Sequence, residues 1–135
     1  RAYYKFPKNR KVFKSKLLAN ETIRKDLMWD NPIVHSSVAF RKEDYLRTPG
    51  YGNFYCAHDY ALFIELLNIG QFSFSNKLSV NYYVNDNSLS RSNNKLCLNE
   101  RFMNQWRALF LFSSESKLFA IKVFLILVIR TIFSI

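Results

Sequence analysis

An aspartate stands at the start of an apolar helical pattern, with a histidine directly before it. Residues 57–70 predict a helix, because apolar side chains recur along them at a spacing of about 3.6 residues. Gly70 follows as a stop signal and predicts a left-handed C-terminal cap. Asp59 would then meet free backbone N–H groups and the positive end of the helix dipole, which favour an ionised carboxylate. Such a carboxylate can accept a proton, although an acid at this place is an ordinary cap in most proteins.

A second group of polar residues lies on a predicted strand. Pro32 keeps Asn31 extended, and residues 33–41 alternate in the manner of a strand. His35 and Ser37 fall on the polar face of that strand, so they would point together towards a cleft. The other interpretation of His35 is a hydrogen-bonded histidine of the core, and the sequence leaves both open.

Several other chemistries have no support in the residue spacing. The sequence contains no evident Ser/His/Asp triad, and its two histidines alone do not make a metal site. Cys56 and Cys97 have no nearby Cys or His at metal-ligand spacing, and a single pair is no disulfide framework. The simpler interpretation is two reduced thiols in a cytoplasmic protein.

Four short motifs follow one another between residues 31 and 63. They are Asn31-Pro32, the stretch His35-Ser36-Ser37-Val38-Ala39-Phe40-Arg41-Lys42, the turn Gly50-Tyr51-Gly52, and His58-Asp59-Tyr60-Ala61-Leu62-Phe63. In this order they resemble the C-terminal half of family 2 glycosyltransferases of the GT-A fold. The similarity extends to about residue 91, where Ser88-Leu89-Ser90 matches the family. The family usually has Glu at position 58 and both Arg and His near positions 83 and 85, so this chain departs from it there.

The resemblance implies an α/β fold. The expected architecture is a partial GT-A (nucleotide-diphospho-sugar transferase) domain over residues 1–112, with a small mixed sheet flanked by helices. Strand-like patterns over residues 71–84 and a helical pattern over residues 96–112 agree with it. The chain opens in a basic segment without Met and contains no Asp-x-Asp, so we expect the acceptor-side half of a longer enzyme.

The resemblance also implies inverting transfer of a sugar from a nucleotide-sugar donor to a glycan or lipid-linked acceptor, in polysaccharide biosynthesis. Asp59 is the expected catalytic base. The expected substrate-binding residues are His35, Ser37, Tyr51, Gly52, His58 and Arg91. Mg²⁺ or Mn²⁺ is implied for the parent enzyme, but the acidic metal-binding motif is missing from these residues. The chain alone is therefore expected to be inactive.

The charge balance suggests an anionic partner. The chain has 20 Lys and Arg against 10 Asp and Glu, a net charge of +10. A nucleotide diphosphate or an anionic lipid surface fits this balance. A basic nucleic-acid-binding module is an alternative, but the aromatic residues around Asp59 occupy core positions rather than an exposed face. We therefore expect no nucleic-acid partner.

The last segment, residues 113–135, is mostly apolar but carries Lys122 and Arg130. Its longest uncharged runs are far shorter than the roughly 20 residues of a membrane span. We expect a helix in the plane of the membrane, peripheral to the inner face of the cell membrane. The alternatives are a truncated spanning helix, a buried core helix, or an inactive membrane-associated fragment as the role of the whole chain.

Overall fold

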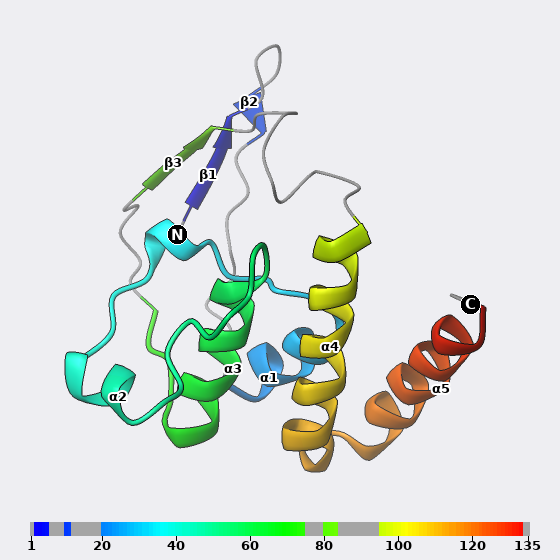
Figure 1. Cartoon of the computed structure of the whole chain (residues 1–135). Coiled ribbons are helices and arrows are strands. Elements are labelled where there is room, and N and C mark those ends of the chain that lie inside the picture. The colour runs from blue at the N-terminus through cyan, green and yellow to red at the C-terminus, as the bar shows by residue number, and fades with distance from the viewer. Residues whose placement is uncertain (1, 6–9, 12–19, 75–79, 84–94, 134–135) are drawn as a thin grey trace.

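The structure is a computed structural model that describes residues 2–5, 10–11, 20–74, 80–83 and 95–133. Helices make up most of this part of the chain (Figure 1). In chain order the elements are β1 (Ala2–Lys5), β2 (Arg10–Lys11), α1 (Asn20–Trp29), the 3-10 helix η1 (His35–Ser37), α2 (Lys42–Leu46), α3 (His58–Ile69), β3 (Val80–Tyr83), α4 (Lys95–Phe112), the 3-10 helix η3 (Ser113–Glu115) and α5 (Lys117–Phe133).

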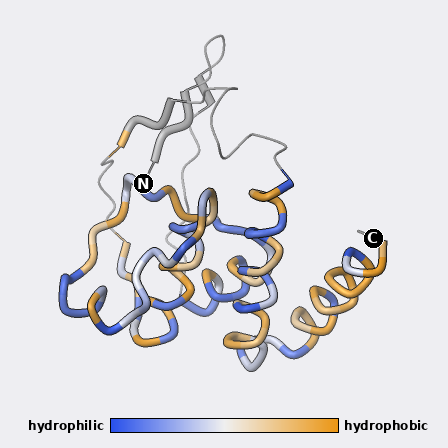
Figure 2. Tube along the Cα trace, viewed as in Figure 1, coloured by the Kyte–Doolittle hydropathy of each residue, from blue (hydrophilic) through white to orange (hydrophobic). Residues whose placement is uncertain are grey.

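Helix α3 forms the centre of the hydrophobic core. Its buried residues are Tyr60, Ala61, Leu62, Phe63, Ile64, Leu66 and Leu67. Helices α1 and α4 pack against it, and α5 packs against α1 and α4. These three helices contribute Ile23, Leu27, Met28, Ala108, Leu109, Phe112, Ala120, Val123 and Leu127. Figure 2 shows α3 largely in the apolar colour, as expected of a helix that is covered on most of its sides.

The expected α/β fold with a mixed sheet flanked by helices is wrong. All the buried core residues lie on α1, α3, α4 and α5 or, in the case of Ala57, directly before α3. The described strands are short, and they form one small sheet in the order β2-β1-β3. Strand β1 pairs antiparallel with β2 and parallel with β3, and Figure 1 shows this sheet at one end of the molecule. Helix packing therefore makes the described core.

The strand predicted over residues 33–41 is also wrong. The 3-10 helix η1 lies in this stretch, and the backbone on either side of it is extended without strand pairing. Local hydrogen bonds explain the difference. The Ser37 hydroxyl donates to the Val34 carbonyl at 2.7 Å, and the Asn31 side-chain oxygen accepts from the Ile33 N–H at 3.0 Å. Short polar side chains that bond to nearby backbone in this way compete with a strand ladder.

The prediction for residues 71–84 is right only at its end. Residues 71–74 form no strand, and β3 begins at Val80; residues 75–79 and 84 lie outside the described residues. The Phe72 N–H donates to the side-chain oxygen of Asn20 at 2.6 Å, and the Phe72 ring packs edge-on against Phe63 at 6.1 Å. Contacts with α1 and α3 therefore hold residues 71–74, and these residues make no strand pairing.

Helix α3 begins and ends differently from the prediction in detail. Ala57 is the N-cap residue and Asp59 is the second residue of the helix, so Asp59 lies in the first turn and does not cap it. Gly70 has a φ of −160°, which is extended backbone, so the expected left-handed cap is wrong. The left-handed conformation occurs instead at Gly50 and Gly52, with φ of 67° and 60°. These two glycines shape the loop between α2 and α3.

Candidate functional site

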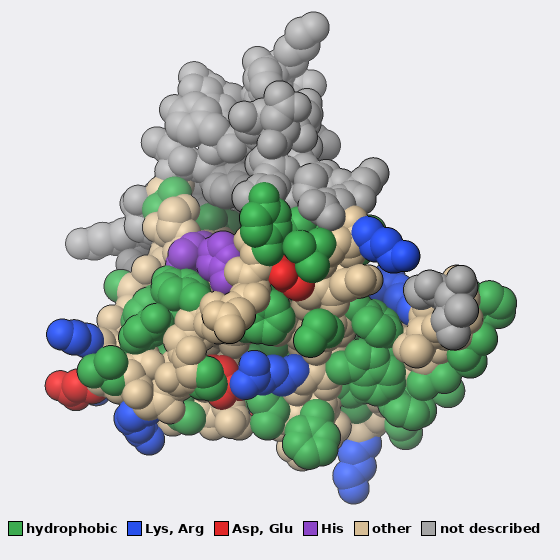
Figure 3. Space-filling view, in the orientation of Figure 1, with side chains coloured by type: hydrophobic (Ala, Val, Ile, Leu, Met, Phe, Trp, Pro, Cys, Tyr) green, Lys and Arg blue, Asp and Glu red, His purple; other side chains and the backbone are tan. Residues whose placement is uncertain are grey.

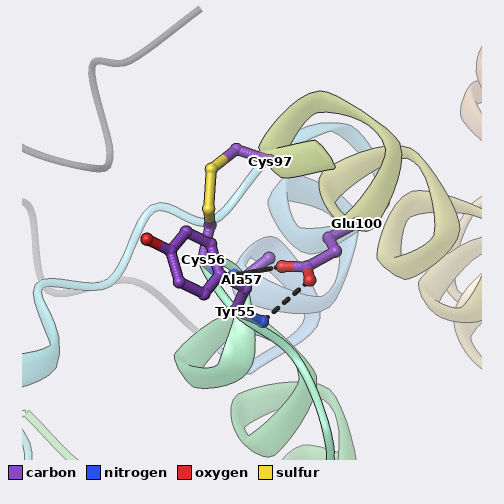
Figure 4. Close-up of a disulfide and its surroundings, with 5 residues drawn as sticks. All are labelled: Tyr55, Cys56, Ala57, Cys97 and Glu100. Carbon is purple, nitrogen blue, oxygen red and sulfur yellow. Dashed lines mark hydrogen bonds between the residues drawn. A yellow bond between two sulfur atoms is a disulfide. The ribbon is translucent and has the colours of Figure 1, made fainter. Parts of the chain in front are cut away.

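Helix α4 holds the segment that leads into α3 (Figure 4). One carboxylate oxygen of Glu100 accepts a hydrogen bond from the Tyr55 N–H at 2.7 Å. The other oxygen accepts from the N–H groups of Cys56 at 2.7 Å and Ala57 at 3.0 Å. A disulfide between Cys56 and Cys97 ties the same segment to α4. The start of α3, and with it His58 and Asp59, is therefore fixed from two points one helical turn apart.

The environment of Glu100 stabilises its ionised form. Burial alone would raise the pKa of this carboxyl group, because only 7% of the residue is exposed. The three backbone N–H groups and the nearby His58 act in the opposite direction, and the pKa is lowered overall. Asn104, one turn further along α4, donates to the Ala57 carbonyl at 3.1 Å and completes the attachment. The carboxylate is thus an anionic anchor for the loop.

The prediction of two reduced thiols is wrong, because Cys56 and Cys97 form a disulfide. The two residues are 41 positions apart in sequence, and their Cα atoms are 5.2 Å apart in the fold. Only the packing of α4 beside the start of α3 brings them together. The thiol argument for a cytoplasmic location does not apply to this structure.

Reducing the disulfide should lower the free energy of unfolding by about 2–4 kcal/mol, because the cross-link restricts the unfolded chain. The measurement is urea unfolding with and without a thiol reductant. A Cys97→Ser variant is the control, since it should have the stability of the reduced protein and no response to reductant. Equal stability of the oxidised and reduced wild-type protein would contradict the prediction.

Polar rings from separate segments meet beside the start of α3. The Nε2 atom of His35 and the Tyr51 hydroxyl are 2.9 Å apart and share a hydrogen bond. The centre of the His58 ring lies 6.0 Å from the ring centre of His35 and 5.6 Å from that of Tyr51, and both contacts are edge-on. The ring centre of Phe63, on α3, lies 6.0 Å from that of His35. We call His35, Tyr51 and His58 the ring cluster; Figure 3 shows the histidines on one face of the molecule.

Asp59 follows the ring cluster directly in sequence and is partly buried. One of its carboxylate oxygens accepts from the side-chain amide of Asn31 at 3.3 Å. The other accepts from the Tyr60 N–H at 2.8 Å. The Asn31 side chain is itself fixed, because its oxygen accepts from the Ile33 N–H. This arrangement holds a carboxylate in one orientation and is suited to accepting a proton from a bound hydroxyl group.

The other predicted site residues are placed less directly. The Ser37 hydroxyl is used by the Val34 carbonyl, and Ser37 does not share a strand face with His35. Gly52 lies exposed in the loop after Tyr51. Arg91 lies outside the described residues. The structure thus brings together His35, Tyr51 and His58, and it attaches Asp59 to Asn31.

Sequence reasoning missed the structural roles of Glu100 and Asn31. Glu100 is the only acid of α4, and it lies three residues after Cys97 on the same face of the helix. The spacing of Cys97 and Glu100 is a signal in the sequence, but the backbone groups that Glu100 contacts lie more than 40 residues earlier in the chain. The sequence predicts only that Asn31 is extended before Pro32, and nothing in it pairs Asn31 with Asp59.

Neither metal ligation nor known relatives identify the site. Within the described residues, no three His, Cys, Asp or Glu side chains are grouped to hold a metal ion. The resemblance implies Mg²⁺ or Mn²⁺ for the parent enzyme, with the acidic motif outside these residues, and this stays a prediction. No family model, curated protein or solved structure matches the chain. The function is therefore argued from the arrangement of the site residues.

Proposed function

We propose that this chain forms the acceptor side of an inverting glycosyltransferase in which Asp59 is the general base. The observation that carries the proposal is the position of Asp59, in the first turn of α3, next in sequence to His58 of the ring cluster and hydrogen-bonded to Asn31. The order of the motifs between residues 31 and 63 favours the same reaction class. The proposal depends on these side chains and needs no α/β architecture.

In the proposed reaction, the acceptor hydroxyl attacks the anomeric carbon of the donor sugar while Asp59 takes the hydroxyl proton. The new glycosidic bond forms as the bond to the nucleoside diphosphate breaks, and that group leaves with the electron pair. Each carboxylate oxygen can accept two hydrogen bonds, so the oxygen held by Asn31 keeps a free position for the acceptor. The proposal assigns the donor diphosphate and its metal ion to residues outside these 135.

The ring cluster is suited to binding a sugar. Its imidazole and phenol groups offer hydrogen-bond donors and acceptors at the edge, and its ring faces offer apolar surface. A sugar presents the same combination, with hydroxyl groups at the rim and C–H groups on the faces. We assign the acceptor sugar to this place and propose that its reacting hydroxyl group reaches Asp59, the residue after His58.

The test is a transfer assay with the full-length protein that carries this chain. A panel of radiolabelled nucleoside-diphosphate sugars is offered together with a lipid and glycan extract as the acceptor. Donor-dependent incorporation of label that Asp59→Asn suppresses would support the proposal. Absence of incorporation from every donor in the panel would overturn it.

Replacing Tyr51 by phenylalanine should raise the KM for the acceptor about tenfold and change kcat much less. The variant removes the hydroxyl that bonds to His35, so it loosens a binding group and leaves Asp59 untouched. Steady-state kinetics at varied acceptor concentration measure the two constants separately. Tyr55→Phe is the matched control, because the Tyr55 ring is exposed and its backbone makes the contact with Glu100. An unchanged KM would remove Tyr51 from the acceptor site.

Helix α5 supports a second part of the proposal, which is attachment to an anionic membrane surface. Among the described residues, no helix combines the length and the apolar character needed to cross a membrane. One face of α5 packs on the core, and the opposite face is an exposed apolar stripe. We call this the α5 stripe; it consists of Leu118, Ile121, Leu125, Ile129 and Ile132. Lys117 and Lys122 flank it and supply charge complementary to anionic lipid.

Replacing Ile121 and Leu125 together by aspartate should abolish binding to anionic vesicles. Two new charges on the α5 stripe oppose both its insertion and its attraction to the lipid. Co-sedimentation with vesicles containing phosphatidylglycerol, at low and high salt, measures the loss. Leu46→Asp is the control, because Leu46 is an exposed leucine on α2, away from the stripe. Failure of the wild-type protein to bind at low salt would contradict the proposal.

A further inference from the structure

A groove separates the end of α1 from one flank of α5. Its volume is about 550 Å³, which lies within the usual range for ligand sites. Asp26, Trp29 and Asn31 line one wall, and Phe119, Lys122 and Ile126 line the other. The first wall is mainly polar with one indole ring, and the second is mainly apolar with one ammonium group.

Two charged groups in this groove lack partners within the described part of the chain. The Asp26 carboxylate makes no ion pair or side-chain hydrogen bond there, and burial raises its pKa. The Lys122 ammonium is likewise unpaired, although it lines the same groove. By contrast, the neighbouring Asp30 is paired with Arg101 at 2.5 Å. Lys122 is exposed and Asp26 is partly buried, and a ligand that both accepts and donates hydrogen bonds can bond to both groups.

The charges in the groove favour a neutral polar ligand. Arg101 neutralises Asp30, and Asp26 and Lys122 carry opposite charges on facing walls, so the lining of the groove has no net charge. A sugar ring meets these conditions, because it is uncharged, has a rim of hydroxyl groups and can lay its C–H groups against an indole ring.

The groove also adjoins the α5 stripe. At about 100° per residue, Phe119, Lys122 and Ile126 lie on a flank of α5 between its buried face and that stripe. An apolar chain attached to a sugar in the groove would therefore continue directly onto exposed apolar side chains. This continuity distinguishes an amphipathic ligand from a free sugar.

We propose that the groove binds the sugar part of a glycolipid, with Trp29 and Asp26 contacting the sugar, Lys122 donating to its hydroxyl groups, and the apolar chain lying along the α5 stripe. Asn31 connects this groove to the candidate site, since it lines the groove and donates to Asp59. The groove is distinct from the ring cluster, to which the proposed function assigns the acceptor sugar. Glycolipid binding in the groove does not depend on that assignment, so it is measured without any sugar donor.

The experiment uses a Trp106→Phe protein, in which Trp29 is the only remaining tryptophan. The octyl glycosides of glucose, galactose and N-acetylglucosamine are titrated below their micelle concentrations while the Trp29 emission is recorded. An octyl polyoxyethylene, which has the same chain without a sugar, is the comparison ligand. We expect saturable binding of at least one glycoside that is about tenfold tighter than that of the comparison ligand.

Asp26→Asn and Lys122→Gln should each weaken glycoside binding about tenfold. Asp44→Asn and Lys42→Gln are the matched controls, since both residues lie on α2 and neither lines the groove, and they should leave binding unchanged. Circular dichroism establishes that every variant is folded. Equal affinity for the glycosides and the comparison ligand, no saturable change with any glycoside, or insensitivity to both groove variants would overturn the proposal. Glycoside binding without any transfer activity would overturn the proposed function alone.

Discussion

Replacing Asp59 by asparagine should lower the rate of sugar transfer by about two to four orders of magnitude, the usual contribution of a general base. The amide has nearly the shape of the carboxylate but cannot take the proton of an acceptor hydroxyl. Because the chemistry and not the binding is affected, kcat should fall while the acceptor KM changes little. The measurement is steady-state transfer by the full-length protein with a saturating donor.

Two comparisons separate this effect from a structural one. Asp44→Asn changes a partly exposed carboxylate on α2 and should leave kcat unchanged. Asn31→Ala removes the amide that orients Asp59, so it should lower kcat by a smaller factor, about tenfold. Full turnover in the Asp59→Asn protein would exclude Asp59 as the base.

Replacing Glu100 by alanine should lower the free energy of unfolding by roughly 3–5 kcal/mol. The variant leaves three backbone N–H groups at the start of α3 without an acceptor, and each unsatisfied buried donor costs about 1–3 kcal/mol. The loss exceeds the usual effect of a single surface substitution. Urea unfolding monitored by circular dichroism measures it.

The same carboxylate should give the protein an acid-sensitive stability. The folded-state pKa of Glu100 is below its ordinary value of 4.5, so the folded state holds the proton less tightly than the unfolded chain does. The contribution of this group is therefore fully present above about pH 4.5 and is lost as the pH falls through the lowered value. A Glu100→Gln protein should lack this part of the pH dependence. Glu43→Gln, an exposed acid on α2, should keep it; identical pH profiles for Glu100→Gln and wild type would contradict the assignment.

Local periodicity predicted the helices well. The pattern over residues 57–70 corresponds to α3, and the pattern over residues 96–112 corresponds to α4. These segments are long and regular, so their apolar spacing decides their structure. A strand needs a partner from elsewhere in the chain, and the stretch from residue 33 to residue 41 has none in the structure.

Contacts between distant segments set the limit of prediction at the site. The sequence singled out His35, Tyr51 and His58, but the expected strand would have paired His35 with Ser37 rather than with Tyr51. The attachments through Cys97 and Glu100 follow from the way α4 packs beside α3. Neither residue carries a local pattern that reveals its partner.

The double attachment of the segment before α3 also bears on the order in which the molecule is built. Both tethers come from α4, more than 40 residues after the segment that they hold. During synthesis, Asp59 emerges from the ribosome well before Cys97 and Glu100. The helix that carries Asp59 can form at once, but its first turn acquires its final position only after α4 has emerged and docked. The growing chain therefore carries the candidate base for some time without the geometry that would make it a catalyst.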